Sequence, residues 1–302
     1  MNFGSDNVYG VHPAIMDAVV AANSGTQDSY GADVYTRRAQ EQLCDLFDCD
    51  LDAFLVLNGT AANSLCLSAM TPPYGAVICH GDAHILVDEC GAPELFTGGA
   101  KLIGINDPLG KLQLDSIEKV LAGFTRGEHD PKPAAVSVTQ ASELGTVYSV
   151  DEIAAIADLA RSRGMKLHMD GARFANALVS LGCTPAEMTW KSGVDALSFG
   201  CTKNGAMMLE AVVFFDTKLA EDFVYRRMRA GQLVSKSRYL GAQMLAYLKD
   251  GLWLDNARRA NELAQRLAKG LLASESIRIP HPVQANEVFA VMPRQLYDDL
   301  QS

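Results

Sequence analysis

Short apolar runs recur along the first two-thirds of the chain, and helical patterns lie between several of them. A strand buried on both faces of a parallel sheet reads as a continuous apolar run, and helices connect neighbouring parallel strands. The alternation therefore predicts an α/β fold with a mainly parallel central sheet flanked by helices. The expected strands are residues 53–57, 76–79, 101–105, 134–138, 166–169, 196–199 and 211–215, and the expected helices among them are 13–22, 36–47, 61–70, 114–124, 150–163 and 173–181.

The pattern changes after Asp216, where helical spacing dominates. Residues 223–248 and 252–273 predict two long helices, 286–292 a strand, and 295–302 the beginning of another helix. We expect a large domain over residues 1–245, including the N-terminal segment, and a smaller α+β domain over 246–302. The smaller domain looks truncated, because a single strand cannot form a sheet of its own.

The composition excludes some classes of partner. The chain has 302 residues and a formal net charge of −10, which disfavours nucleic acid and anionic membranes, since both bind basic surfaces. No apolar run is long enough to span a bilayer, and the N-terminus has no signal-peptide pattern. Seven dispersed cysteines form neither a CxxC motif nor a zinc-binding spacing. We therefore expect reduced thiols, a cytoplasmic protein and no metal.

An acid and an amine end two neighbouring apolar runs. Asp170 follows the run 166–169, and Lys203 follows the run 196–199. Residues at the carboxyl ends of parallel strands meet in one crevice, where this pair suits pyridoxal phosphate: the amine forms a Schiff base and the acid keeps the pyridine nitrogen protonated. Taken alone, Asp170 could instead cap the next helix, and Lys203 could be a solvated surface charge. The two together favour catalysis.

Three further segments carry side chains for the same chemistry. Asn58-Gly59-Thr60 lies between a strand and a helix, where free N–H groups bind phosphate, although a plain turn looks similar. Arg173 lies near a helix start, which is an unfavourable place for a cation. A role in binding a substrate carboxylate would explain an arginine there better than a surface ion pair would. His84 is able to stack on a cofactor ring and accept a proton, whereas His168 suits a supporting place in the core.

Together the motifs resemble those of the low-specificity L-threonine aldolases, which are pyridoxal-phosphate enzymes of fold type I, the aspartate-aminotransferase-like fold. The resemblance runs from Phe3 to about Val291, and each motif is weak alone, but their order is highly specific. The motifs are Phe3-Gly-Ser5-Asp6-Asn7, Tyr30-Gly-Ala-Asp33, Asn58-Gly-Thr60-Ala-Ala-Asn, His84 with Asp88-Glu-Cys-Gly-Ala-Pro, His168-Met-Asp-Gly-Ala-Arg173, and Ser198-Phe-Gly-Cys-Thr-Lys-Asn-Gly.

The resemblance implies a role for each matching residue. Catalysis would involve Lys203 as the Schiff-base lysine, Asp170 at the pyridine nitrogen and His84 stacked on the ring. The implied cofactor-binding residues are Gly59, Thr60, His84, Asp170, Arg173 and Lys203; the implied substrate-binding residues are Ser5, Arg173 and Tyr30; and Arg229 and Lys236, together with Tyr30, are implied to reach across a subunit interface. Such an interface implies a dimer or a dimer of dimers, a homotetramer, with shared active sites.

The implied reaction is retro-aldol cleavage of L-threonine, L-allo-threonine and related β-hydroxy-α-amino acids to glycine and an aldehyde. Two departures bear on it. Where many relatives have an Asn-Thr-His-Asn motif, this chain has Thr139-Gln140-Ala-Ser142-Glu143, which is closer to the phenylserine aldolases and removes one candidate base. Relatives also extend some tens of residues beyond Ser302. A β-eliminating lyase of the same fold, a catalytically impaired truncated form and a non-catalytic scaffold remain alternatives.

Overall fold

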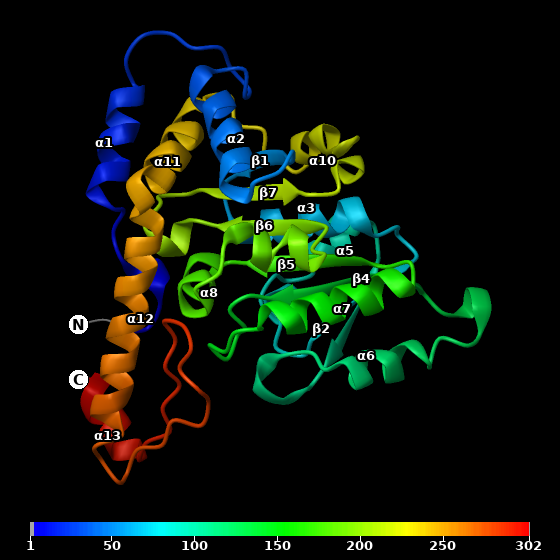
Figure 1. Cartoon of the computed structure of the whole chain (residues 1–302), viewed down its shortest axis with the longest axis vertical. Helices are drawn as coiled ribbons and strands as arrows, with labels where there is room; N and C mark the ends of the chain where they lie inside the picture. The colour runs from blue at the N-terminus through cyan, green and yellow to red at the C-terminus, as the bar shows by residue number, and fades with distance from the viewer. Residues whose placement is uncertain (1–2, 302) are drawn as a thin grey trace.

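A seven-stranded sheet forms the centre of the molecule, in the order β1-β7-β6-β5-β4-β2-β3 (Figure 1). The computed structural model describes residues 3–301. Strand β7 runs antiparallel to its neighbours β1 and β6, while the other pairs are parallel. The predicted, mainly parallel α/β fold is thus confirmed. The strands are β1 Asp52–Val56, β2 Gly75–His80, β3 Lys101–Ile105, β4 Lys132–Thr139, β5 Lys166–Gly171, β6 Ala196–Gly200 and β7 Glu210–Phe214.

Helices cover the sheet on both faces. In Figure 1, α7 and α8 lie in front of the strands and α3 and α5 lie behind them. The α-helices are α1 Pro13–Ala22, α2 Val34–Phe47, α3 Gly59–Met70, α4 His84–Val87, α5 Ala92–Thr97, α6 Leu114–Leu121, α7 Val150–Ser162, α8 Phe174–Leu181, α9 Pro185–Met188, α10 Phe223–Arg229, α11 Arg238–Leu248, α12 Leu252–Leu271 and α13 Arg294–Gln301.

Aromatic side chains join the layers at the centre of the core. Phe47 of α2, Phe174 of α8 and Phe199 of β6 are fully buried, and their ring centroids lie 5.5–6.0 Å apart. Trp253 of α12 stacks on Phe174 at 6.4 Å. Aromatic contacts of this kind add to the free energy gained by burial. The long C-terminal helix is therefore packed into the same core as the sheet.

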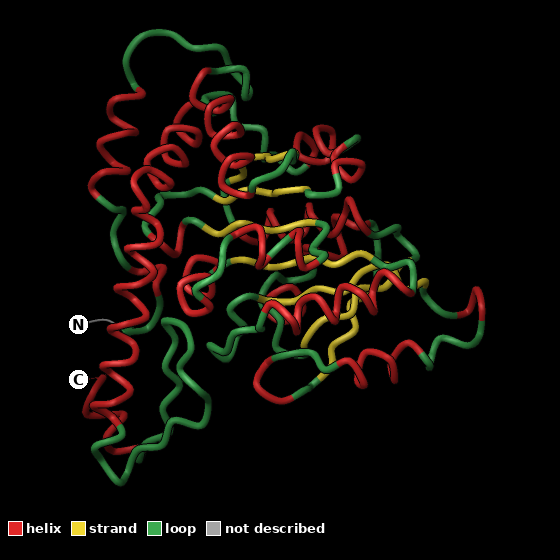
Figure 2. Tube along the Cα trace, viewed as in Figure 1, coloured by secondary structure: helices red, strands yellow, loops and turns green. Residues whose placement is uncertain are grey.

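Two predictions for the C-terminal third are wrong. The helix expected over residues 223–248 is two helices, α10 and α11, because the chain turns at Gly231, whose φ of +69° is left-handed. The strand expected over 286–292 is a loop (Figure 2), in which Val291 makes one isolated bridge with Arg278. In addition, the short helices α4 and α5 were not predicted, because a single turn leaves no periodic pattern.

The N- and C-terminal segments lie along one side of the sheet, next to each other (Figure 1). Helix α11 packs against α1 and α2, and its Gly241 approaches the α2 backbone closely: a methyl group there would lie 2.6 Å from the backbone of Tyr35. Asn261 of α12 exchanges hydrogen bonds with Asn176 of α8, at 3.0 and 2.9 Å. Within residues 3–301, no helix is long and apolar enough to cross a membrane.

Candidate active site

A cavity of about 240 Å³ opens at the carboxyl ends of the central strands. Five of the predicted site residues line it: Lys203, Asp170, His84, Gly59 and Thr60. They come from β5, from the turn after β6, from α4 and from the start of α3. The parallel packing of β5 and β6, in which Asp170 lies opposite Ser198, brings the acid and the lysine turn to one edge of the sheet.

Asp170 is held by hydrogen bonds to both of its carboxylate oxygens. The residue is 3% exposed. Its Oδ2 accepts from Nδ2 of Asn63 at 2.8 Å, and its Oδ1 accepts from the backbone N–H of Ala172 at 3.0 Å. Bonds of this kind stabilise the ionised form of a carboxyl group. The carboxyl group is therefore fixed in place, and it lines the cavity.

Lys203 lies in a short 3-10 turn, Thr202–Asn204, that ends at Gly205 with a φ of +109°. The Nδ2 group of Asn204 donates to the Tyr247 hydroxyl and to the Trp253 carbonyl, both at 2.8 Å. On the other side of the turn, Oε2 of Glu210 accepts from the backbone N–H of Cys201 at 2.7 Å. Residues from β7, α11 and α12 thus fix the backbone that carries the lysine.

The start of α3 offers unpaired donors to the cavity. Asn58 caps the helix by accepting from the N–H of Ala61 at 2.8 Å. Among the described residues, the N–H groups of Gly59 and Thr60 have no protein acceptor. Among the described residues, no atom outside Gly59, its chain neighbours and the nearby α3 backbone lies within 4 Å of the place where a Cβ of Gly59 would stand. This open helix start, with its positive end of the dipole, suits a phosphate group.

His84 is paired with a buried carboxylate. Its Nδ1 lies 2.8 Å from Oε1 of Glu89, whose side chain is fully buried and also accepts from Asn63. The hydrogen bond to Glu89 raises the pKa of His84 above its ordinary value, in spite of partial burial. The imidazole is therefore stabilised as a cation, and its ring remains about one-third exposed, at 32%.

Arg173 lies outside the residues that line the cavity and is engaged by two carboxylates. Its Nε is 2.9 Å from Oδ2 of Asp6, and its Nη1 is 3.1 Å from Oε1 of Glu287. Asn286 also donates to Asp6, at 3.2 Å. Ser5, the other predicted carboxylate contact, is exposed and caps the short helix Asp6–Val8. Segments from both ends of the chain therefore meet at this guanidinium.

The remaining predicted residues lie on the surface and not in the cavity. Tyr30 is 56% exposed, and its N–H donates to the carbonyl of Ser235, which places it beside Lys236. Arg229, at the end of α10, is exposed, as is Lys236.

His168 is fully buried between the hydroxyl groups of Ser137 and Ser198, at 2.9 and 3.0 Å, and burial lowers its pKa to about 4. That location agrees with a supporting place in the core.

Several polar residues that shape the site were not predicted from the sequence. Asn63 and Glu89 stood within motifs used for the resemblance, so their position next to Asp170 and His84 could have been suspected. Glu143 and Glu210 line the cavity as well, and Glu287 reaches Arg173 from a segment with no recognisable motif. Among the described residues, no group of three or more histidine, cysteine and acidic side chains is arranged to hold a metal ion.

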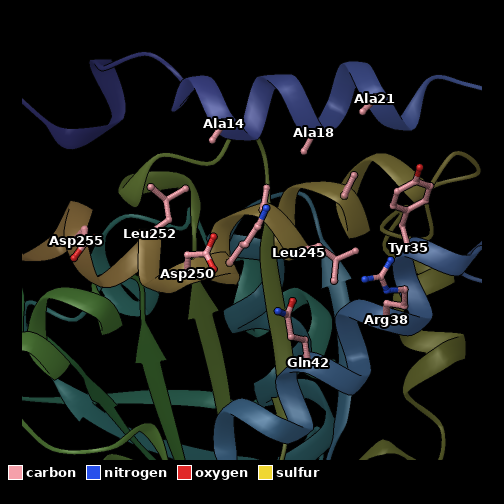
Figure 3. Close-up of a pocket in the computed structure, with 13 residues that line it drawn as sticks. Ala14, Ala18, Ala21, Tyr35, Arg38, Gln42, Leu245, Asp250, Leu252 and Asp255 are labelled. Atoms are coloured by element: carbon pink, nitrogen blue, oxygen red, sulfur yellow. The ribbon is translucent and has the colours of Figure 1, made fainter.

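A larger cavity, of about 740 Å³, contains none of these residues. It lies between α1, α2 and α11, where Ala14 and Ala18 face Gln42 and Leu245 across the space (Figure 3). Its walls include the amine of Lys249 and the carboxyl groups of Asp250 and Asp255, but these residues lie on or between helices and not at the carboxyl ends of the central strands. Cavity volume alone therefore does not locate the reactive site in this protein.

Comparisons with known proteins agree with the geometry. A profile of the family described as beta-eliminating lyases matches residues 2–295. The chain belongs to this family. The low specificity L-threonine aldolase of Pseudomonas sp. (strain NCIMB 10558) is 47% identical over 300 residues, which cover 99% of this chain and 86% of the relative. The enzyme of the same name from Pseudomonas aeruginosa is 47% identical over 287 residues, which cover 95% of this chain and 83% of that one.

A solved structure agrees with these sequence comparisons. The threonine aldolase of Leishmania major superposes with a TM-score of 0.92 at 30% identity, covering 98% of this chain and 86% of its own. The chain is thus a member of the low-specificity L-threonine aldolase group, as its motifs predicted, and the enzymes of this family depend on pyridoxal phosphate. The cavity fits that cofactor, since it presents an amine, a buried carboxylate and unpaired N–H donors at a helix start.

Proposed function

We propose that the protein cleaves L-threonine, L-allo-threonine and related β-hydroxy-α-amino acids, such as L-phenylserine, to glycine and an aldehyde. The proposal rests on one observation: Lys203, Asp170 and the open start of α3 line a single cavity, in a chain 47% identical to L-threonine aldolases over nearly its whole length. Bound pyridoxal phosphate supplies an electron sink for the electron pair of the broken Cα–Cβ bond.

In this proposal the residues of the cavity hold the cofactor in distinct ways. Lys203 supplies the amine for covalent attachment, and Asp170 holds a proton at the pyridine nitrogen. The N–H groups of Gly59 and Thr60 bind the phosphate, and His84 lies against the ring. The network of Asn63, which donates to both Asp170 and Glu89 at 2.8 Å, keeps the two acidic groups at fixed positions.

The substrate's carboxylate is assigned to Arg173 and Ser5, with Tyr30 reaching the site of a neighbouring subunit across the proposed interface. A bidentate contact to a guanidinium fixes both the position and the plane of a carboxylate. Fixing it orients the Cα–Cβ bond for cleavage and lowers the entropic part of the barrier. Because Asp6 and Glu287 occupy the guanidinium of Arg173, the incoming carboxylate has to displace at least one of them.

We also propose that the protein is a cytoplasmic homo-oligomer, a dimer or a dimer of dimers, with Tyr30, Arg229 and Lys236 at the subunit interface. All three are exposed, and α10 presents apolar Val224, Tyr225 and Met228 at 50–69% exposure beside Arg229. Exposed apolar patches of this kind mark association surfaces.

We further propose that residues 1–245 form the large cofactor-binding domain and that residues 246–302 form the smaller one.

The test uses the purified full chain loaded with pyridoxal phosphate and supplied with L-threonine or L-phenylserine. Formation of glycine and the matching aldehyde supports the proposal. Ammonia and a keto acid from L-serine, with no glycine, would instead identify a β-eliminating lyase. The Lys203→Ala variant should lose multiple turnover while its far-UV circular dichroism stays that of the parent. Sustained turnover by that variant would refute the role of Lys203.

A further inference from the structure

Three carboxyl groups line the cavity, and two of them are already engaged by the protein. Asp170 accepts hydrogen bonds from Asn63 and Ala172, and Glu210 accepts from the backbone of Cys201. The third, Glu143, takes part in no hydrogen bond or ion pair with any other residue in the range 3–301. It is therefore the one acidic side chain of the cavity whose oxygens are free to bind another molecule.

The backbone around Glu143 is fixed by hydrogen bonds within its own turn. The N–H of Ser142 donates to the carbonyl of Thr146 at 2.8 Å, and the N–H of Gly145 donates to Ser142 at 2.9 Å. The hydroxyl groups of Ser142 and Thr146 lie 2.7 Å apart. Gly145 has a φ of +72°, which closes the turn. A fixed turn with an unpaired carboxyl group at its tip is typical of a pre-organised reactive group.

The surroundings of Glu143 shift the protonation equilibrium of its carboxyl group. Burial raises the pKa of its carboxyl group above the ordinary value; the negative charge of Asp170 acts in the same direction, and the charges of Arg173, His84 and Lys203 oppose the shift. A carboxyl group whose pKa moves towards neutrality both accepts and returns a proton more readily.

His84, the histidine in the same cavity, is less suited to accept a proton. Its Nδ1 is committed to Glu89 at 2.8 Å, and that contact favours the imidazolium form. A cationic imidazole has no lone pair to offer. Its charge instead stabilises negative charge in the site. The attraction between His84 and Glu143 lowers the pKa of Glu143, against the effect of burial.

We propose that Glu143 is the proton acceptor for the β-hydroxyl group of the substrate. The inference rests on the proposed function and deepens it. The Glu143 carboxylate takes the hydroxyl proton, the O–H electron pair forms the carbonyl bond of the aldehyde, and the Cα–Cβ bond breaks with its electron pair left on Cα. A proton then adds to Cα, which gives glycine, and the proton held by Glu143 returns to solvent. Atoms and charge balance without any further reactant.

The experiment compares Glu143→Gln with the parent in two reactions that share the cofactor. Cleavage of L-threonine needs the hydroxyl proton removed, whereas exchange of the Cα hydrogen of glycine with D2O does not. We expect the variant to lose about 100-fold or more in kcat for cleavage and to lose the rising limb of its pH profile. Glycine exchange, followed by proton NMR, and the visible spectrum of the loaded protein should stay within a few-fold of the parent.

Two further variants sharpen the result. Glu143→Asp retains the acid one methylene shorter and should recover part of the cleavage rate. Glu118→Gln removes an exposed carboxylate of α6 that does not line the cavity, and should match the parent in both reactions. Cleavage by Glu143→Gln within tenfold of the parent would overturn the inference. A parallel loss of exchange and cleavage would overturn it too, because it would show that Glu143 acts by positioning the cofactor.

The failure of the proposed function has a separate signature. A parent protein that binds pyridoxal phosphate and exchanges glycine, yet releases no glycine from L-threonine or L-phenylserine, is not an aldolase of these substrates. That outcome also removes the role given to Glu143. A parent that cleaves, alongside a Glu143→Gln variant that cleaves equally well, leaves the function standing and overturns the inference alone.

Discussion

Nη1 of Arg173 lies 3.1 Å from Oε1 of Glu287, so the guanidinium assigned to the substrate already holds a carboxyl group of its own chain. Both side chains are largely buried, at 13% and 16% exposure. Burial raises the pKa of Glu287 to about 7, against the opposing attraction of Arg173. The contact therefore strengthens as the pH rises through neutrality, when Glu287 becomes anionic and competes best with an incoming carboxylate.

The Glu287→Gln variant should bind glycine more tightly at pH 8. Loss of an ion pair worth about 1 kcal/mol corresponds to roughly a fivefold lower Kd. At pH 5.5 Glu287 is protonated in the parent, so the two proteins should differ little there. Titration of the loaded protein with glycine, read from its visible spectrum, measures both values. Equal affinities at pH 8 would mean that Glu287 does not compete for Arg173.

The Glu89→Gln variant should lower the pKa of His84. The carboxylate of Glu89 is the main cause of the raised pKa, through a 2.8 Å hydrogen bond, and an amide carries no charge to stabilise the imidazolium ion. Titration of the imidazole resonances by NMR reads the change, with His84→Asn used to assign the signal. An unchanged pKa in the variant would place the cause elsewhere in the cavity.

Two helical glycines should respond in opposite directions to alanine. At Gly241 of α11 an added methyl group would meet the backbone of Tyr35 at 2.6 Å, so Gly241→Ala should cost about 1–3 kcal/mol of unfolding free energy. At Gly270 of α12 nothing lies within 4 Å, and Gly270→Ala should add up to about 1 kcal/mol. Urea unfolding measures both. Equal changes would show that helix propensity, and not close packing, governs Gly241.

The contribution of Glu210 to the free energy of unfolding should fall as the pH rises from about 4.5 to 7, opposite in sign to the contribution of His168, whose pKa is lowered. Burial raises the pKa of Glu210 to about 7 from the ordinary 4.5, so the folded state binds more protons than the unfolded state in that window. The Glu210→Gln variant keeps an acceptor for the Cys201 N–H and should show a shallower fall, by on the order of 3 kcal/mol at most. Urea unfolding of cofactor-free protein at pH 5 and pH 8 tests this. Identical slopes would contradict it.

The central sheet and the cavity at its edge could be predicted from sequence because their causes are local. Buried parallel strands read as apolar runs, and neighbouring strands of that kind bring Asp170 and Lys203 together. The pairing of Arg173 with Asp6 and Glu287 could not be predicted, because ionic contacts between distant segments leave no periodic trace. Likewise, one residue decided the break after α10: Gly231 turns the chain where apolar spacing continued to favour helix.

Glu143 shows a different limit. In the sequence it is one residue of the segment Thr139-Gln140-Ala-Ser142-Glu143, which replaces the Asn-Thr-His-Asn motif of many relatives, and its loop has no regular pattern. Only the cavity reveals that Asp170 and Glu210 are bonded while Glu143 is not. A free carboxyl group is a property of its surroundings, and residue type alone does not disclose it.

The side chains of Asp6 and Asn286 are hydrogen-bonded to each other, although 280 positions separate them in sequence. A ribosome releases the first of these residues near the start of translation and the second near the end. The surroundings of Arg173 are therefore completed only after almost all of the described chain has emerged, later than the sheet that bears the lysine. Long-range closure of this kind slows folding, and it means that a nascent chain has its central strands before the ionic contacts of Arg173 with Asp6 and Glu287 are complete.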